Sequence, residues 1–439
     1  MLLVSPDPVA PSMAGPGIRY LELGRALAAE HDVTLAAPVG SRPVEGAPDL
    51  ALYDPDRPRT LWRLFGPRQV LVAPPLPPAL LSTSALRGVR WIVDLYNPEP
   101  FEGLEYRRTR PRLERRLRDI ARIDRVGFAA RRGTAFVCGT ERQRDMWLGF
   151  LAASRRLDSD RYAHDAQLRA LIDVVPFGLP SEGPRPAPRP VLRGRLLPAS
   201  ARIMVWGGGI WDWLDPLTVL RALALLRADD PEWALAFVAT TRPGGEEHAM
   251  AARAIRLASE LGLREGEAVH FRLECLPYAD RGALLLEADM GVSAHGSTLE
   301  ARFAHRARFF DYVWAGLPVL CTEGDDWSAR VVAEGLGEAV APADPHAFAE
   351  AARRIAHRGR GAYDEVLRAA AASRSWHVAA EPLRRLITTV TDTPRPRRDL
   401  AAAAFALRYT AASIAERALR RPAAALDRAT ARAAAAGER

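Results

Sequence analysis

Short apolar runs alternate with stretches of helical periodicity along most of this 439-residue chain. Such alternation is typical of parallel α/β layers, in which each buried strand is followed by a covering helix. In the first half, the pattern predicts helices such as Arg19–Glu30 and Arg110–Arg131. The strands predicted there are Leu2–Val4, Val33–Ala37, Val70–Ala73, Trp91–Tyr96, Thr134–Cys138 and Ile172–Pro176.

A proline-rich stretch, residues 181–200, interrupts this alternation and is typical of a linker. The alternation then resumes, with helices that include Pro216–Arg227 and Pro345–His357. The strands predicted after the linker are Arg202–Trp206, Trp233–Ala239, Val269–Leu273, Met290–Ala294, Pro318–Thr322 and Glu338–Ala341. Because single domains cluster near ~100–200 residues, we expect an α/β protein with two Rossmann-like, doubly wound domains, residues 1–180 and 201–375, facing each other across a cleft.

The last segment, residues 376–439, is rich in Ala and Arg with helical spacing and is interrupted at Pro422. One interpretation is a helix packed across both domains and followed by a frayed, basic tail. We favour it because Ala-rich faces bury little area in lipid. The alternative is an amphipathic helix lying at a membrane surface.

The net charge of the chain is +8 at pH 7, and every basic residue is an arginine. The arginines are scattered and no aromatic-interleaved nucleic-acid motif is present, so we expect no nucleic-acid partner. Peripheral contact with an anionic membrane fits this charge better.

The cysteines Cys138, Cys275 and Cys321 lie far apart and form neither a zinc pattern nor a disulfide framework. This spacing favours a reducing cytoplasm. The N-terminal MLLVSPDP lacks a basic start and predicts a buried strand instead of a signal peptide. No apolar run approaches the ~20 residues of a membrane helix. We therefore expect a cytoplasmic protein, with peripheral contact at the inner face of the membrane left open.

Two glycines, Gly15 and Gly17, stand between the first predicted strand and the first predicted helix. Glycine lets the backbone approach a ligand closely, and a helix N-terminus offers free N–H groups to an anion. Arg19 lies in the first helical turn, where a positive charge opposes the helix dipole, so we expect it to face a ligand or a neighbouring carboxylate. A plain tight turn explains the two glycines equally well.

A second glycine cluster, Gly207–Gly209, follows the predicted strand Arg202–Trp206 and precedes a helix with Asp215 as its N-cap. Three glycines in a row cost conformational entropy, which indicates that bare backbone is needed against a ligand such as a diphosphate. The spacing is not that of the dinucleotide-binding GxGxxG motif. Trp211 and Trp213 either line the cleft or close the core beneath the loop.

Asp94 lies at the end of a predicted strand, where a carboxylate can position a hydroxyl or accept its proton. A cap or an internal hydrogen bond is the alternative role. The histidines show no metal-binding spacing, so we expect neither a metal nor another cofactor.

The stretch Arg306–Asp325 combines an arginine-rich start, a helix carrying Asp311, a Gly-Leu-Pro break and an apolar strand. This order places a carboxylate and guanidinium groups at the rim of a parallel sheet, where open α/β sheets bind their ligands. An ordinary helix–strand junction would have the same pattern.

Together these segments resemble the family 4 glycosyltransferases, which have two Rossmann domains in the GT-B architecture, and the resemblance covers nearly the whole chain. The loop of Gly15 and Gly17 with Arg19 is similar to the family's N-terminal glycine-rich loop. Gly207–Gly209 resembles the opening of its donor domain. The segment DYVWAGLPV, which begins at Asp311, is similar to the one that carries the second glutamate of the family's Glu-x7-Glu motif.

The chain also departs from the family pattern. Phe303 occupies the position of the first glutamate, and Glu300 is the nearest acid before it. The lysine that binds diphosphate in the family is missing, and Arg306 or Arg308 could supply its charge. These differences indicate a divergent branch.

The resemblance implies metal-independent transfer of a sugar from a nucleotide-sugar donor to an acceptor hydroxyl, with retention of anomeric configuration. Saccharides, lipid-linked sugars and small molecules are possible acceptors, in polysaccharide or natural-product biosynthesis. It implies Asp94, Arg306 and Glu300 as catalytic residues and Arg19 and Tyr96 on the acceptor side. The donor-binding residues would be Gly208, Gly209, Ile210, Arg308, Asp311, Gly15 and Gly17.

Two other functions remain open for the same fold. One is related chemistry, as in a pseudo-glycosyltransferase or a sugar-nucleotide epimerase. The other is a non-catalytic protein that binds a nucleotide sugar.

Overall fold

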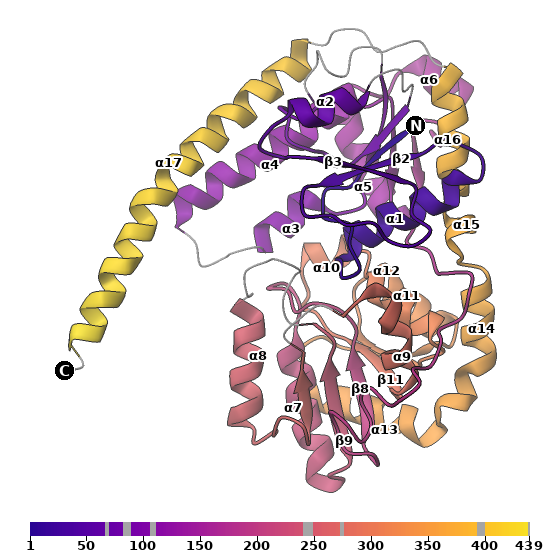
Figure 1. The fold of residues 1–439 in the computed structure, drawn as a ribbon, viewed down its shortest axis with the longest axis vertical. Coiled ribbons are helices and arrows are strands. Elements are labelled where there is room, and N and C mark those ends of the chain that lie inside the picture. Colours follow the sequence, from indigo (N-terminus) through magenta and orange to yellow (C-terminus); the bar gives the residue numbers. More distant parts are fainter. Residues whose placement is uncertain are drawn as a thin grey trace.

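Two parallel sheets organise the chain, and they lie one above the other in Figure 1. The structure is a computed structural model that describes residues 1–65, 70–81, 89–105, 111–239, 249–272, 276–392 and 400–437, with side chains as far as residue 418. Each sheet is built from strands of consecutive sequence, so the two halves of the chain form the two domains that the alternating pattern predicts.

The first sheet has seven parallel strands in the order β3-β2-β1-β4-β5-β6-β7. They are β1 (Leu2–Val4), β2 (Thr34–Pro38), β3 (Asp49–Tyr53), β4 (Val70–Ala73), β5 (Arg90–Asp94), β6 (Ala135–Cys138) and β7 (Ile172–Val174). Six of them confirm predicted strands. The sequence pattern missed β3, because this edge strand is mostly exposed or half-buried and therefore lacks a continuous apolar run.

The second sheet has six parallel strands in the order β10-β9-β8-β11-β12-β13. They are β8 (Arg202–Trp206), β9 (Trp233–Phe237), β10 (Val269–Phe271), β11 (Met290–Ser293), β12 (Val319–Thr322) and β13 (Gly337–Val340). All six were predicted, although Leu273, the predicted end of β10, lies outside the described residues.

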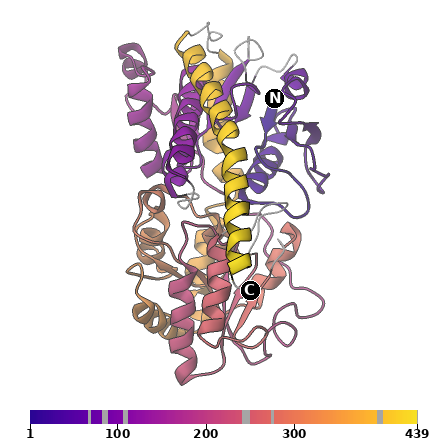
Figure 2. The same ribbon diagram turned by 90° about the vertical axis from the view of Figure 1, so that its left-hand side faces the viewer.

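Helices connect the strands of both sheets (Figures 1 and 2). Those of the first half are α1 (Gly15–Ala28), α2 (Arg59–Phe65), α3 (Glu99–Glu105), α4 (Arg112–Arg132), α5 (Glu141–Ala153) and α6 (Ser159–His164). Those of the second half are α7 (Pro216–Asp229), α8 (Ala249–Glu260), α9 (Arg281–Leu286), α10 (Leu299–Phe303), α11 (Ala307–Trp314), α12 (Asp326–Ala333), α13 (Pro345–Arg358) and α14 (Asp364–Ala372), with single 3-10 turns at Tyr278–Asp280 and Arg360–Tyr363.

The strand order reverses between β1 and β4 in the first sheet and between β8 and β11 in the second. Ligands of doubly wound sheets bind at such switch points, outside the carboxyl ends of the strands. The chain leaves β1 toward Gly15 and Gly17 and leaves β8 directly into Gly207–Gly209. Both glycine clusters therefore lie at switch points.

The proline-rich linker is held on the second domain by one carboxylate. Glu287 accepts hydrogen bonds from the backbone N–H groups of Val191, Leu192 and Arg193 at 2.7, 2.8 and 2.9 Å. Leu192 is fully buried in the core. The linker thus has a defined path along the second domain.

The chain crosses back to the first domain near its end, through α15 (Trp376–Ala379) and α16 (Glu381–Asp392). Helix α16 packs against β4, β5, β6 and β7 through its buried face, and Arg384 donates to the carbonyl of Ala26 at 2.9 Å. The C-terminal segment therefore completes the core of the first domain.

The last helix, α17 (Leu400–Gly437), lies along α4 of the first domain, and its far end stands clear of both domains in Figure 1. The pairs Gly127 with Phe405 and Arg118 with Glu416 show that the two helices run antiparallel. The predicted packing across both domains is wrong for this helix. The predicted break at Pro422 is also wrong, because α17 continues through it. Within the described residues, no helix has the length and hydropathy to cross a membrane.

Candidate active site between the domains

Arg308, in the first turn of α11, is a buried positive charge beside the glycine loop that follows β8. Its Nη2 donates to the carbonyl of Gly209 at 3.1 Å, and its guanidinium carbon lies 4.6 Å from the centroid of the Trp206 ring. Its Nη1 has no hydrogen-bond partner, and no carboxylate lies within ion-pair distance, as far as the described residues go. Burial, with a smaller contribution from Arg306, lowers the pKa of Arg308 to about 10. A buried charge without a partner is unfavourable unless a ligand neutralises it.

The backbone at Gly207–Gly209 is shaped around that arginine. Gly208 has a φ of +115°, a conformation that disfavours side chains, and the nearest atom to a Cβ placed there would be Nη2 of Arg308, at 3.9 Å. The N–H of Gly207 donates to the hydroxyl of Tyr312 at 2.7 Å, which ties the loop to α11. Ile210, a predicted donor-binding residue, has its side chain fully buried in the core.

The N-terminus of α11 points into the same region. Arg306 occupies its N-cap position and makes no capping hydrogen bond with its side chain. The first N–H groups of a helix carry a partial positive charge that favours anions. The uncapped helix end and the unpaired Arg308 both favour a negatively charged ligand.

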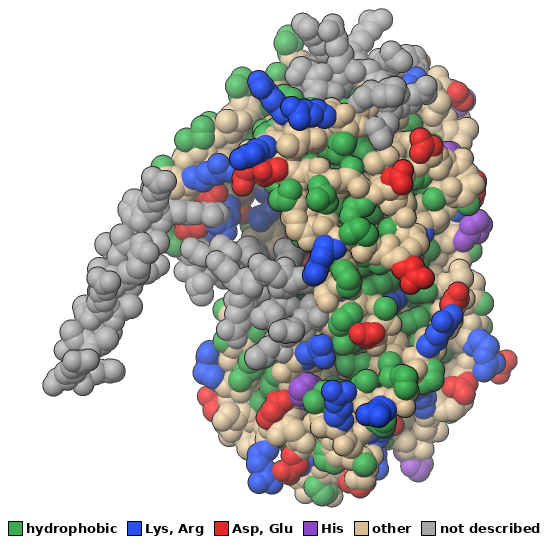
Figure 3. All heavy atoms as spheres, in the orientation of Figure 1, with side chains coloured by type: hydrophobic (Ala, Val, Ile, Leu, Met, Phe, Trp, Pro, Cys, Tyr) green, Lys and Arg blue, Asp and Glu red, His purple; other side chains and the backbone are tan. Residues whose placement is uncertain are grey.

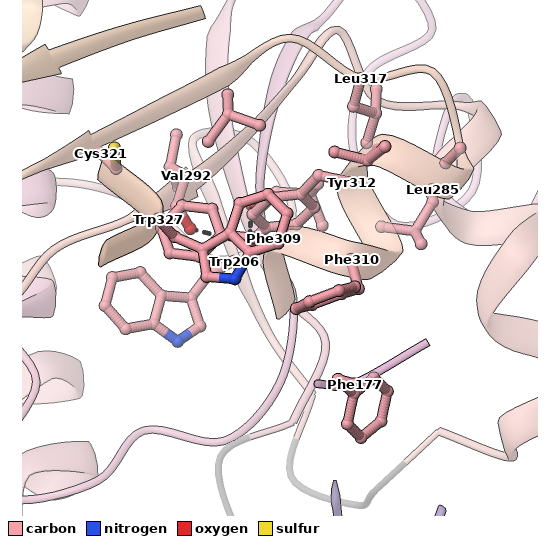
Figure 4. Close-up of a cluster of buried hydrophobic side chains, with 14 of the residues drawn as sticks. Phe177, Trp206, Leu285, Val292, Phe309, Phe310, Tyr312, Leu317, Cys321 and Trp327 are labelled. Atoms are coloured by element: carbon pink, nitrogen blue, oxygen red, sulfur yellow. Dashed lines mark hydrogen bonds between the residues drawn. The ribbon is translucent and has the colours of Figure 1, made fainter. Parts of the chain in front are cut away.

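Below this end, an aromatic cluster fixes α11 (Figure 4). The rings of Phe309 and Trp327 stack with centroids 6.0 Å apart, and Phe310 meets Trp327 edge-on at 4.5 Å. Phe177, from the first half of the chain, packs on Phe310 at 5.7 Å. The cluster therefore joins the two domains beneath the arginines.

Two predicted catalytic residues, Glu300 and Arg306, bind each other. The guanidinium of Arg306 donates from Nη1 and Nη2 to the two oxygens of Glu300 at 3.1 and 2.8 Å, and both side chains are buried. Asp325 lies 4.0 Å from Nε of Arg306. Burial alone would raise the pKa of Asp325, but His295, Arg306 and the N–H of Ser328 outweigh burial and lower it. This network neutralises its own charges, whereas Arg308 has no acidic partner among the described residues.

Asp94 and Arg19 form a second buried ion pair, at the switch point of the first sheet. Arg19 donates from Nε and Nη2 to the carboxylate of Asp94 at 2.8 and 3.1 Å and from Nη1 to the carbonyl of Pro176 at 3.0 Å. Its guanidinium lies 4.4 Å from the centroid of the Tyr96 ring. Burial favours neutral arginine, but Asp94 outweighs it and raises the pKa of Arg19. Of the two partners expected for Arg19, the structure contains the carboxylate.

Tyr96 and His305 meet where the domains touch. The hydroxyl of Tyr96 donates to the carbonyl of His305 at 3.2 Å, and Nε2 of His305 accepts the N–H of Phe177 at 3.1 Å. Gln143 reaches across as well, donating to the carbonyl of Phe303 at 2.8 Å. Burial lowers the pKa of His305 to about 3, so the ring is neutral and carries its proton on Nδ1. Nothing in the local sequence pattern predicts these contacts, because they depend on how the domains pair.

Asp311, the predicted ribose-binding residue, is half-buried and pairs with Arg281, whose Nε lies 2.9 Å from Oδ1. The guanidinium of Arg281 lies between the rings of Tyr278 and Trp314, at 3.6 and 4.4 Å from their centroids. Sequence reasoning missed Arg281, because only the tertiary structure brings α9 beside α11.

Gly15 and Gly17 differ in their surroundings. A Cβ on Gly17 would lie 2.8 Å from the carbonyl oxygen of Pro8, whereas a Cβ on Gly15 would meet no atom within 4 Å. Gly17 is therefore needed for the close approach of α1 to the preceding loop, and Gly15 faces open space.

Among the described residues, no group of three or more His, Cys, Asp or Glu side chains could hold a metal ion. The absence of a metal requirement stays a prediction.

Comparisons with known proteins identify the fold to which this architecture belongs. No protein-family model matches the chain, and no curated protein sequence matches it. Solved structures do match over nearly the whole length. The chain has the GT-B fold, shared with glycosyltransferases.

Three of these structures illustrate the likeness. Sucrose-phosphate synthase from Thermosynechococcus elongatus matches with a TM-score of 0.62 and 14% identity, over 89% of this chain and 98% of that one. WaaG, a glycosyltransferase involved in lipopolysaccharide biosynthesis, matches with a TM-score of 0.59 and 16% identity, over 90% and 100%. HepE from Anabaena, solved in complex with UDP-glucose, matches with a TM-score of 0.60 and 11% identity, over 89% and 99%. At such identities the likeness establishes the fold.

Proposed function

We propose that this protein is a glycosyltransferase that moves a sugar from a nucleotide-sugar donor to the hydroxyl of an acceptor. The observation that carries the proposal is Arg308, a buried cation with no acidic partner among the described residues, beside the Gly208–Gly209 backbone at the switch point of the second sheet. A donor diphosphate would supply the negative charge that this arrangement lacks. The GT-B neighbours, one of them solved with UDP-glucose, support the same ligand class.

The proposed chemistry needs stabilisation of a leaving diphosphate. The buried Arg308 and the first N–H groups of α11 would bind its oxygens through charge-assisted hydrogen bonds. We propose that transfer retains anomeric configuration, needs no metal, and lets the diphosphate accept the acceptor's proton. Asp311 would hold the ribose hydroxyls while sharing its carboxylate with Arg281.

The predicted catalytic residues Asp94, Glu300 and Arg306 are all engaged in buried ion pairs. Each charge in such a pair is already compensated by its partner. The pair is therefore better suited to hold its loops in place than to exchange protons. We propose that they position the cleft for reaction. Arg19 and Tyr96 would then shape the acceptor side through Asp94 and His305.

Donor binding tests the proposal directly. UDP-, GDP-, ADP- and dTDP-sugars are titrated against the protein, its Arg308→Ala variant and an Arg354→Ala control, whose arginine is exposed and pairs with Glu338. One donor should bind, and Arg308→Ala should weaken it at least ~10-fold, since a hydrogen bond to a charged group contributes ~1.5–3 kcal/mol. Arg354→Ala should bind like the parent.

Turnover distinguishes the remaining functions. Donor hydrolysis or transfer by the parent, lost in Arg308→Ala, supports the enzyme. Tight binding of a donor without turnover, with a range of acceptors, would favour the non-catalytic alternative. If none of the four donor classes binds, the nucleotide-sugar proposal is wrong.

Two further proposals concern where the protein is located in the cell. We propose a reducing, cytoplasmic location, consistent with the buried thiols of Cys138 and Cys321, which are not in disulfides. We also propose peripheral contact with an anionic membrane.

A further inference from the structure

Helix α17 has one apolar face that is buried and a second that is exposed. The buried face packs on α4 through Ala402 and Ala412, while Phe405 covers Gly127. A Cβ on Gly127 would lie 2.4 Å from the Phe405 ring, so the two helices touch closely there. This face accounts for the attachment of α17 to the first domain.

The opposite face of α17 carries Leu400, Leu407 and Ile414 at intervals of seven residues. Their exposed fractions are 88%, 73% and 64%. On the same side, Ala404 and Ala411 lie between them and Ala418 follows Ile414, and all three are also exposed. Scattered exposed leucines are ordinary, but an aligned stripe along one helix face indicates a partner.

Figure 3 shows hydrophobic side chains along the outer edge of this helix. The element on which α17 packs is α4, which lies on its other side. The face formed by Leu400, Ala404, Leu407, Ala411, Ile414 and Ala418, here called the outer face, points away from the domain.

The charged residues near the outer face are mostly basic. Two acidic residues of the helix pair are held in its seam, where Asp124 pairs with Arg408 at 2.7 Å and Glu416 with Arg118 at 2.6 Å, while Asp119 pairs with Arg122 on its own helix. The same two helices carry exposed arginines, Arg112, Arg115 and Arg116 on α4 and Arg417 on α17. The sequence after Ala418 adds five arginines and two acidic residues. The surroundings of the outer face are therefore basic.

We propose that the outer face of α17 docks on the surface of a bilayer containing anionic phospholipids. The aliphatic side chains would enter the boundary between headgroups and acyl chains, and the flanking arginines would contact lipid phosphates. A second copy of the chain fits less well, because pairing two such faces would bring arginines together without exposed acids on the described part of α17 to meet them. The proposal does not depend on transferase chemistry.

Vesicle binding tests it. The full chain is mixed with phosphatidylcholine vesicles with and without phosphatidylglycerol, and the bound fraction is measured by sedimentation. The test variant is Leu400→Gln/Leu407→Gln/Ile414→Gln. The matched control, Leu52→Gln/Val332→Gln/Val378→Gln, changes three aliphatic residues that are similarly exposed elsewhere, at 50%, 59% and 51%.

The parent and the control should bind the anionic vesicles, and the test variant should bind at least ~10-fold more weakly. Added salt should weaken the parent, because screening removes the arginine contribution. Equal binding by test and control variants would overturn the proposal, as would equal binding to vesicles without phosphatidylglycerol. Light scattering tests the competing possibility that the outer face binds a second copy of the chain. If the parent forms a dimer but does not bind vesicles, and the test variant is monomeric, the outer face is a dimer interface and the proposal is wrong. Donor binding, measured in parallel, should be the same in all three proteins and reports on the proposed transferase separately.

Discussion

At the scale of single residues, the structure divides the arginines near the cleft by what they pair with. Arg19 and Arg306 have buried carboxylate partners, and Arg281 pairs with Asp311. Arg308 has none among the described residues. In sequence, Arg306 and Arg308 are two positions apart and equally suited to bind a diphosphate. Only the packing of Glu300 against Arg306 distinguishes the arginine with a buried carboxylate partner from the one without.

This difference predicts opposite effects on stability. Arg308→Met removes a buried charge that has no acidic partner, so the free energy of unfolding should rise by ~1–2 kcal/mol without ligand. Arg19→Met leaves Asp94 buried and unpaired, which should lower it by ~3–5 kcal/mol. Denaturant unfolding of both variants measures the effects. A loss of stability in Arg308→Met comparable to that of Arg19→Met would show that Arg308 is compensated within the protein.

At the scale of elements, the loop–helix junctions after β1 and β8 were predicted as ligand-facing from their glycines, and both lie at switch points. The sequence treated Gly15 and Gly17 alike. The structure separates them, because α1 packs so closely on the loop before it that Gly17 has no room for a side chain. Sequence and structure also differ in what they indicate for α17. Its alanines argued against contact with lipid, whereas the exposed side chains of Leu400, Leu407 and Ile414 argue for it.

The two glycines of α1 therefore give a matched pair of variants. Gly17→Ala places a methyl group 2.8 Å from a backbone oxygen and should destabilise the protein by ~1–3 kcal/mol. Gly15→Ala meets open space and should be neutral or stabilising by up to ~1 kcal/mol, because alanine favours the helix. Thermal unfolding with calorimetry compares them. Equal destabilisation by both would contradict the packing described for α1.

At the scale of the whole molecule, the C-terminal segment belongs structurally to the first domain. The buried residues Leu383, Leu386, Ile387 and Val390 of α16 cover a sheet formed more than two hundred residues earlier in the chain. Side chains of Tyr96, Gln143 and His305 then join the two domains through hydrogen bonds.

This arrangement predicts which fragments fold. Residues 1–180 alone would expose the sheet face that α16 covers, with about 1.5–3 kcal/mol lost for each large aliphatic residue of α16. They should lack a cooperative unfolding transition in circular dichroism. Residues 1–180 joined by a flexible linker to residues 376–418 should regain one. A cooperative transition in the short fragment would show that α16 is dispensable for the first domain.

The amino-acid sequence by itself determined every strand except β3, the division into two α/β halves and the glycine loops after β1 and β8, because hydrophobic period and turn chemistry are local properties. It also singled out Arg19, Arg306, Arg308, Asp94 and Asp311 as candidate site residues, and their roles stay predictions. The tertiary structure decided which of them bind each other, since ion pairs such as Arg19 with Asp94 join residues 75 positions apart. It also decided that α16 completes the first domain and that one face of α17 is left uncovered. These outcomes depend on which surfaces meet, and distant surfaces leave no periodic signal in the sequence.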